Sequence, residues 1–310
     1  MTGIQGKPNV QVANAPCSYG AFEFTVGIDE NVPDGLAVLD FVAGAGYAGI
    51  DLGPVGYLGD GGELRDRLAE RGLALAGGYV PLPFSDPDAF ADQIGYLDSM
   101  LDILDAAPAG PMPARPTLAD AGSPARQANP GVAASQRELG LDDEGWALFA
   151  GGLTTAISMC RDRGYEPTFH HHLGTYIEAV WEIERVLELT DVGLCLDTGH
   201  LLAGGGEPAA GLREWSGRIN HIHLKDAKRD LLARIVAERA PMEEIWRRRA
   251  FCALGDGDVG MDEVLRTIVA NGYSGWLVVE QDIFPDPAEA PGQVAARQAA
   301  NRDWLRSRGI

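Results

Sequence analysis

Short apolar, β-rich runs alternate along the chain with longer stretches in which apolar residues recur every three to four positions. This alternation is typical of β–α units around a parallel sheet. Eight runs qualify as strands: Val10–Ala13, Gly49–Leu52, Leu73–Tyr79, Thr117–Ala119, Thr168–His172, Val192–Asp197, Ile219–Leu224 and Trp276–Glu280. Helical periodicity covers, for example, Glu63–Arg71, Ala89–Leu104, Glu144–Arg163, Ile177–Leu189 and Asp262–Ala270. Eight such units predict an α/β chain closed into a (β/α)₈ TIM barrel.

Two long segments interrupt this rhythm. Residues 106–141 are rich in Pro, Ala and Gly, and residues 227–260 combine a charged helical stretch with a turn-rich run. We expect one barrel domain over residues 1–310, with 106–141 and 227–260 as insertions or long loops at the C-terminal face. Segments of this length either take part in function, as a lid or a subunit contact, or are solvent-exposed segments without a functional role.

Charge and cysteine content restrict the partners and the compartment. The chain has 310 residues, 45% of them hydrophobic, and a net charge of −20, which disfavours nucleic acids and anionic lipid surfaces as partners. Its four cysteines are far apart and form no metal or disulfide motif. The N-terminus has no secretion signal, and no apolar run is long enough to span a membrane. These features predict a cytoplasmic protein with reduced thiols.

The histidines show where chemistry is expected. All six lie in three short clusters at the ends of predicted strands: His170, His171 and His172, then His200, then His221 and His223. The carboxyl ends of barrel strands are where the catalytic residues of such enzymes gather. The clusters therefore predict an active site at that end of the barrel.

Strand alternation decides which side chains converge, because residues two apart point to the same side. Four neighbouring strands offer His170, Asp197, His223 and Glu280 to one point at the barrel mouth. Two imidazoles and two carboxylates suit one divalent ion: Mn²⁺, Co²⁺, Fe²⁺, Zn²⁺ or Mg²⁺. The alternative is a metal-free pocket lined by hydrogen-bonded polar pairs.

Five segments together resemble a known superfamily: GIDLGPVGYL, PTFHHHLGTYIE, GLCLDTGHLLAGG, INHIHLKD and GWLVVEQD. They are similar to the sugar phosphate isomerase/epimerase superfamily of xylose-isomerase-like barrels, which act in carbohydrate metabolism. Within it, the motif HHH-x-G-T resembles the inosose (2-keto-myo-inositol) dehydratase branch. The resemblance runs from about Asn14 to about Asp282.

The resemblance implies that Asp197, His223 and Glu280 are metal ligands, with Mn²⁺ or Co²⁺ as the expected ion. Superfamily epimerases supply a glutamate from the strand that ends in three histidines here, and this strand has no such carboxylate. We expect His170 to replace it, with His171 as the alternative. An epimerase moves a proton between two carboxylates, whereas a dehydratase needs one base, so the substitution favours elimination.

Further residues near the strand ends are expected to take part in catalysis or substrate binding. Glu280 is expected to serve as general base as well as ligand, with His172 or His200 as a substrate hydrogen-bonding group or acid. Lys225 would support the enolate charge electrostatically, and Asp51 would bind a substrate hydroxyl. The alternatives are that His200 orients Asp197, that Lys225 pairs with the adjacent aspartate and that Asp51 caps a loop.

The resulting hypothesis is a metal-dependent carbon–oxygen lyase that dehydrates a cyclic polyol ketone. A sugar or cyclitol isomerase or epimerase is the first alternative, and elimination-type cleavage of a 3-keto glycoside is the second. A DNA-repair endonuclease is disfavoured by the charge of −20 and the small number of histidines, and a non-catalytic sugar-binding barrel would not bind metal. Many barrels of this superfamily form homo-oligomers, and the long segments offer surface for such contacts.

Overall fold

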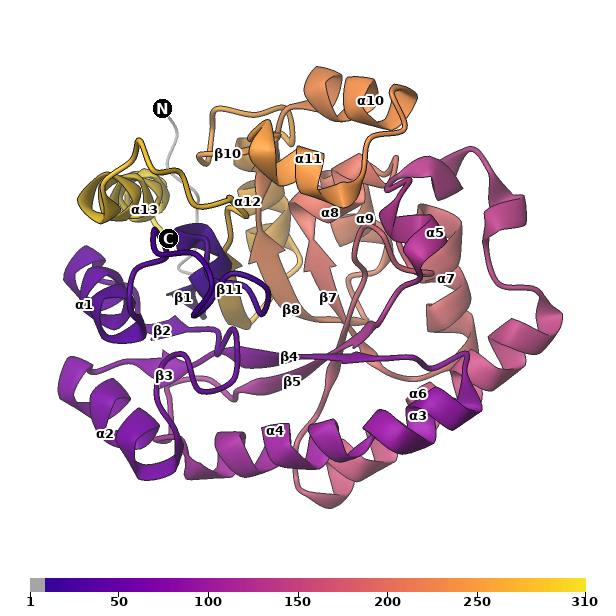
Figure 1. Ribbon diagram of the computed structural model, residues 1–310, viewed down its shortest axis with the longest axis horizontal. Helices are drawn as coiled ribbons and strands as arrows, with labels where there is room; N and C mark the ends of the chain where they lie inside the picture. The colour runs from indigo at the N-terminus through magenta and orange to yellow at the C-terminus, as the bar shows by residue number, and fades with distance from the viewer. Residues whose placement is uncertain (1–8) are drawn as a thin grey trace.

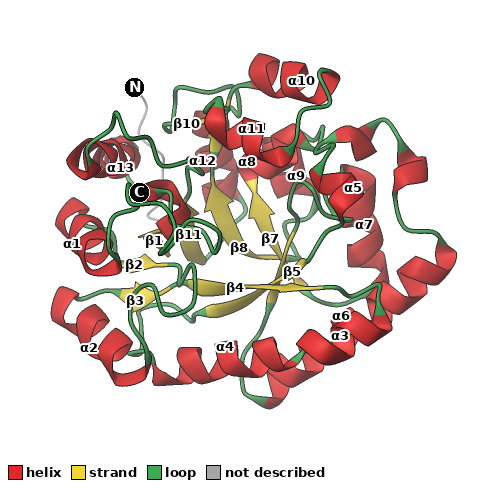
Figure 2. Cartoon of the chain, viewed as in Figure 1, coloured by secondary structure: helices red, strands yellow, loops and turns green. Residues whose placement is uncertain are grey.

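The computed structural model describes residues 9–310 and contains a parallel β-barrel enclosed by helices (Figure 1; Figure 2). The strand order is β3-β2-β1-β11-β8-β7-β6-β5-β4, and every pairing in this sheet is parallel. The strands are β1 (Val10–Asn14), β2 (Gly49–Ile50), β3 (Ala74–Leu75), β4 (Gly77–Leu82), β5 (Arg115–Asp120), β6 (Thr168–His170), β7 (Gly193–Asp197), β8 (Ile219–Leu224) and β11 (Gly275–Val279).

The barrel closes through β3 and β4, which are two parts of one predicted strand. β3 pairs with β2, β4 pairs with β5, and the backbone N–H of Leu52 donates to the carbonyl of Gly77 at 3.0 Å. Counting β3 and β4 as one gives the eight strands expected, so the predicted (β/α)₈ barrel is confirmed.

The helices form the outer layer. They are α1 (Gly35–Ala45), α2 (Gly61–Arg71), α3 (Pro87–Gln93), α4 (Gly95–Ala106), α5 (Pro124–Gln127), α6 (Asp143–Asp162), α7 (Val180–Leu189), α8 (Thr198–Ala203), α9 (Pro208–Glu214), α10 (Arg229–Ala237), α11 (Met242–Arg247), α12 (Met261–Ala270) and α13 (Pro291–Arg306). The stretch predicted as one helix over Ala89–Leu104 is two, α3 and α4, divided at Ile94. Gly95 follows the break, and glycine is a weak helix former.

The two ends of the chain meet in the helical layer. Helix α13 lies beside α1 (Figure 1), and the Tyr47 hydroxyl, just after α1, donates to the carbonyl of Gln298 in α13 at 2.8 Å. Within residues 9–310, no helix combines the length and the apolar character needed to cross a lipid bilayer.

The position of residues 106–141 differs in part from the prediction. The stretch before β5 lies at the N-terminal end of the barrel, where the indole N–H of Trp276 donates to the carbonyl of Pro113 at 3.1 Å. The ring of Trp276 fills this end of the barrel, because Gly49 has no side chain to exclude it. The stretch after β5 reaches the C-terminal face, as expected.

Residues 227–260 cover the C-terminal face as well. They contain helices α10 and α11 and a short antiparallel pair, β9 (Asp226–Ala227) with β10 (Phe251–Cys252). The carboxylate of Asp226 accepts hydrogen bonds from the backbone N–H groups of Gly255, Gly257 and Val259, which fixes the turn-rich run. Asp226 is therefore occupied by this turn and forms no ion pair with Lys225, contrary to the alternative considered from the sequence.

Candidate active site

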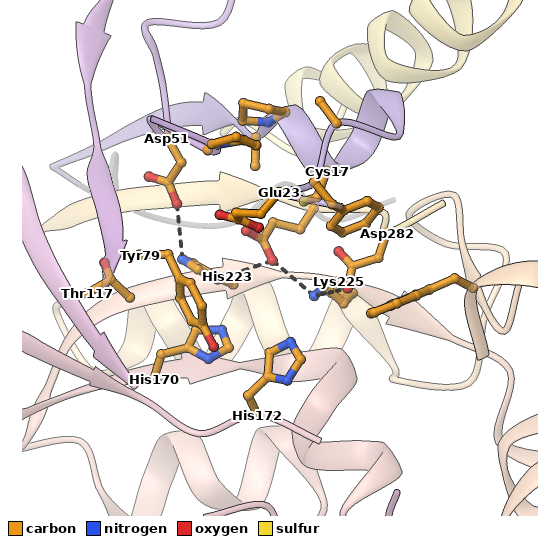
Figure 3. A pocket seen from close by; sticks show the side chains of 18 of the residues that line it. Cys17, Glu23, Asp51, Tyr79, Thr117, His170, His172, His223, Lys225 and Asp282 are labelled. Atoms are coloured by element: carbon orange, nitrogen blue, oxygen red, sulfur yellow. Dashed lines mark hydrogen bonds and ion pairs between the residues drawn. The ribbon is translucent and has the colours of Figure 1, made fainter. Parts of the chain in front are cut away.

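Four side chains from neighbouring strands converge at the C-terminal end of the barrel. His170 ends β6, Asp197 ends β7, His223 lies in β8, and Glu280 follows β11. One potential ligand atom from each lies within 4.8 Å of those of the other three. Figure 3 shows His170 and His223 pointing into one cavity together with Asp51, Lys225 and Asp282.

The carboxylate of Asp197 is oriented by the start of helix α8. Its Oδ1 accepts hydrogen bonds of 2.8 Å from the backbone N–H groups of Gly199 and His200, an N-cap arrangement. Its Oδ2 is buried and has no hydrogen bond within residues 9–310. It lies 3.7 Å from Nε2 of His170 and 3.8 Å from Nδ1 of His223. Helix α8 thus presents one oxygen of Asp197 to the two histidines.

The neighbours His170 and His171 have different surroundings. Nε2 of His171 accepts a hydrogen bond of 3.2 Å from the backbone N–H of Asp197, so this nitrogen is occupied by a contact between β6 and β7. His170 faces the cavity and belongs to the convergent group. Between the two ligand candidates considered from the sequence, the geometry therefore favours His170.

His223 lies between two carboxylates. Its Nδ1 is 3.2 Å from Oε2 of Glu280, and its Nε2 is 3.6 Å from Oδ2 of Asp51, which follows β2 on the other side of the mouth. A carboxylate on the far nitrogen is a frequent means of orienting a ligating histidine. Burial raises the pKa of Asp51 to about 7, so this carboxyl is close to its titration midpoint at neutral pH.

Lys225, at the end of β8, is buried among three carboxylates. Its Nζ lies 3.1 Å from Oδ2 of Asp197, 3.0 Å from Oε2 of Glu280 and 2.9 Å from Oδ2 of Asp282. Burial lowers the pKa of this ammonium, but the three carboxylates outweigh burial and raise it well above its ordinary value. Burial likewise opposes ionisation of Glu280, yet His223 and Lys225 hold its pKa well below the ordinary value. Both groups are therefore charged at neutral pH.

His172 and His200 differ in their access to the cavity. Nδ1 of His172 lies 2.7 Å from the carbonyl of Leu173, so this nitrogen must carry the proton. Burial lowers the pKa of His172 to about 3, which leaves a neutral ring whose Nε2 can accept a hydrogen bond from a ligand in the cavity that the residue lines. His200 does not line this cavity; its Nε2 lies 3.0 Å from Nζ of Lys225.

The cavity above these groups, called the inner cavity here, has a volume of about 210 Å³. Sequence reasoning missed several of its walls. Asp282 was detectable, because it lies two residues after Glu280 on a β-like alternation. Cys17, Glu23, Phe22, Phe24 and Trp246 carry no such signal, since they come from a single 3₁₀ turn, from a loop and from α11. His221 is fully buried and does not line the cavity.

The convergent residues fit a divalent cation. They provide two imidazole nitrogens and two carboxylate oxygens, a mixed donor set that transition-metal dications accept. Asp197 Oδ2 and both ring nitrogens of His223 are buried and make no hydrogen bond among the described residues, although Lys225 Nζ lies 3.1 Å from the first and Glu280 Oε2 lies 3.2 Å from Nδ1 of the second. A coordinated cation would compensate the burial of these polar atoms.

Comparison with known proteins agrees with this architecture. Residues 39–308 match the xylose isomerase-like TIM barrel family. The inosose dehydratase of Geobacillus kaustophilus is 29% identical over 266 residues, which cover 84% of this chain and 84% of that protein. The inosose dehydratase of Clostridium beijerinckii is 35% identical over 153 residues, which cover 48% of this chain and about half (51%) of that protein.

Solved structures share the fold at low identity. The IOLI protein with a bound zinc atom superimposes with a TM-score of 0.71 at 12% identity, covering 97% of this chain and 99% of that chain. The 3-keto-D-glucoside 4-epimerase of E. coli superimposes with a TM-score of 0.63 at 14% identity, covering 97% of this chain and 100% of that chain. At these identities the likeness concerns the fold.

Proposed function

This chain belongs to the xylose isomerase-like TIM barrel family, and we propose that it is a divalent-metal-dependent lyase that removes water from a cyclic polyol ketone. Its similarity to inosose dehydratases and its epimerase neighbours support an enzyme acting on sugar-like or cyclitol substrates. The observation that carries the proposal is the convergence of His170, Asp197, His223 and Glu280 at the mouth.

These four residues would hold the cation, with Mn²⁺ or Co²⁺ as the expected ion. A bound dication polarises the substrate carbonyl and so makes the neighbouring C–H bond more acidic. Asp51 would orient His223 beside the cation. Because Asp51 also lines the inner cavity, it would accept a hydrogen bond from a substrate hydroxyl.

The histidine at the end of β6 supports elimination over inversion. Glu280 is ionised, lines the inner cavity and can accept the proton next to the carbonyl. On β6, where superfamily epimerases carry their second carboxylate, this chain has His170, whose ring faces Asp197. Three other carboxylates also line the inner cavity, but none of them lies on β6: Glu23, Asp51 and Asp282. Loss of a β-hydroxyl needs only one base and a proton donor, which Glu280 and the neighbouring groups can supply.

Three further residues would support the reaction. Lys225 is a permanent cation beside Glu280, so it would stabilise negative charge that develops on the substrate oxygen. The neutral His172 would accept a hydrogen bond from a substrate hydroxyl through Nε2 and act in proton transfer there. His200 would hold Lys225 in place through their contact of 3.0 Å, as a positioning residue.

The test is a product assay with inosose and Mn²⁺ in deuterated water, comparing the unchanged protein with Glu280→Gln. Formation of a dehydrated dione that Glu280→Gln abolishes would support the lyase. The matched control is Glu263→Gln, an exposed residue paired with Arg213, which should retain activity. Deuterium entering beside the carbonyl without loss of water would instead indicate an isomerase or epimerase. Absence of both with every metal tried would contradict the proposal.

A further inference from the structure

A second cavity, called the outer cavity here, adjoins the inner cavity at the barrel mouth. Its volume is about 410 Å³, about twice that of the inner cavity. The two cavities share four lining residues: Phe24, Tyr79, His172 and Trp246. A molecule held over the convergent site can therefore extend past these side chains into the outer cavity.

Most of the outer cavity is lined by three parts of the chain: the end of β5 with the loop after it (Asp120 to Ala128), the loop after β6 (His172 to Thr175), and Pro241 with α11. Phe24, from the loop after β1, and Tyr79, from β4, complete the lining. The loops after β5 and β6 are in close contact, since a Cβ placed on Gly122 would lie 2.6 Å from the carbonyl oxygen of Gly174. Both glycines also have positive φ, a backbone conformation that residues with a side chain rarely adopt. The close contact of the two loops therefore requires glycine at these positions.

A buried ion pair holds these walls. Arg126, in the short helix α5, is only 1% exposed, and its Nη2 donates to both carboxylate oxygens of Glu182 at 2.8 and 2.9 Å. Its Nε donates to the carbonyl of Thr175 at 2.8 Å, which ties the loop after β5 to the loop after β6. Two of the segments that line the outer cavity are thus tied to each other and to α7.

The lining indicates the chemistry of the occupant. It includes no lysine or arginine, whereas Asp120 and Glu243 both contribute carboxylates, so a phosphate or carboxylate would be repelled. The aromatic rings of Trp246, Phe24 and Tyr79 give the lining an apolar part, which suits an apolar face of a ligand. Oxygen acceptors beside aromatic faces match an uncharged ring that carries hydroxyl groups.

Two polar groups of the lining are free to bind a ligand. Asp120 is 2% exposed, and its Oδ1 accepts hydrogen bonds from the backbone N–H groups of Gly122 and Tyr176. Its other oxygen, Oδ2, accepts no hydrogen bond from residues 9–310 and is not fully buried. The indole N–H of Trp246, a residue 8% exposed, has no acceptor within the same range. A hydroxyl-bearing ligand supplies both a donor and an acceptor.

We propose that the outer cavity binds a second, uncharged sugar ring, joined by a glycosidic bond to the ketone-bearing ring in the inner cavity. This inference rests on the proposed ketone chemistry and narrows it, because the substrate is then a keto glycoside and not a single-ring ketone. Asp120 accepts a hydrogen bond from the second ring, and Trp246 contacts the junction of the two rings.

The experiment compares the keto disaccharides 3-keto-trehalose and 3-keto-cellobiose with the one-ring counterpart methyl 3-ketoglucoside. Dissociation constants for the Mn²⁺-loaded protein are measured by stopped-flow tryptophan fluorescence, which reports binding before turnover. At least one keto disaccharide should bind at least ten times more tightly than the one-ring ketone. Ala128→Trp, which fills the outer cavity from an exposed position, should remove that advantage.

The matched control is Ala125→Trp, an exposed residue of α5 that lies three residues before Ala128 and does not line the outer cavity, and it should retain the advantage. Equal binding of one-ring and two-ring ketones, or an advantage that survives Ala128→Trp, would overturn the subsite. Proton exchange is measured separately, with inosose and with both keto disaccharides. Disaccharide binding without exchange in any of these ketones would refute the proposed reaction only, and exchange without a preference for two rings would refute the subsite only.

Discussion

The ring of His171 accepts a hydrogen bond of 3.2 Å from the backbone N–H of Asp197. Strand β6 ends one residue earlier, at His170, so this ring continues the pairing between β6 and β7 where the backbone ladder has stopped. Adjacent histidines therefore have separate tasks: His171 satisfies the backbone of Asp197, and His170 faces its carboxylate.

This division predicts different consequences for two neighbouring substitutions. His170→Ala should weaken Mn²⁺ binding by more than about 100-fold, the upper end of what losing an outer-shell partner costs. His171→Ala leaves a buried N–H without an acceptor and should cost about 1–3 kcal/mol of folding stability. Calorimetric metal titration and urea unfolding of both variants make the comparison. If His171→Ala weakens metal binding more than His170→Ala, the assigned ligand is wrong.

Lys225 offers a test of the charge balance in the site. Lys225→Met would leave Asp197, Glu280 and Asp282 close together without a cation, so the metal-free protein should lose about 3–5 kcal/mol of stability. Mn²⁺ should restore more stability to this variant than it adds to the unchanged protein, because the ion then supplies the missing positive charge. Urea unfolding in EDTA and in Mn²⁺ measures both effects.

Lys228→Met is the matched control, since Lys228 is exposed three residues further on; it should change stability by less than about 0.5 kcal/mol. Equal stabilisation of Lys225→Met and the unchanged protein by Mn²⁺ would contradict the assignment of Lys225 as a neighbour of the cation.

The buried pair of Arg126 and Glu182 should behave as a unit. Arg126→Met leaves Glu182 buried without its cation and should cost about 3–5 kcal/mol, while adding Glu182→Gln should recover part of that loss. Limited proteolysis should also cut residues 121–141 faster in the single variant, because the wall has lost its anchor. The double-mutant cycle is measured by urea unfolding, and strictly additive losses would show that the pair is not coupled.

The raised pKa of Asp120 predicts that the folding stability depends on pH. Burial raises its pKa to about 6, against an ordinary value of 3.8. At pH 5 the folded protein keeps this proton while the unfolded chain has released it, so stability should fall as the pH rises. One pKa unit corresponds to about 1.4 kcal/mol, which is the loss expected between pH 5 and pH 7.5.

Asp120→Asn does not titrate, so its unfolding free energy should lack this contribution, and the difference between variant and unchanged protein should change with pH by that amount. A difference that stays constant from pH 5 to pH 7.5 would mean that burial does not raise this pKa.

Much of the fold was predictable because periodicity is local. Each strand carries its apolar residues within its own two to six positions, and β8 was predicted at its observed bounds of Ile219 to Leu224. The predictions were wrong where periodicity is weaker. The break at Ile94 and the position of residues 106–114 depend on contacts with distant elements.

For the site, alternation along each strand was enough to predict which groups lie at the strand ends, because it places His170, Asp197, His223 and Glu280 on the inward side of their strands. The surroundings of these groups come from the packing of distant elements: Lys225 lies among three carboxylates, His200 lies behind Lys225, and Asp282 and Trp246 line the inner cavity. A cavity and its charge balance depend on distances between elements far apart in the chain, and no local sequence pattern encodes those distances.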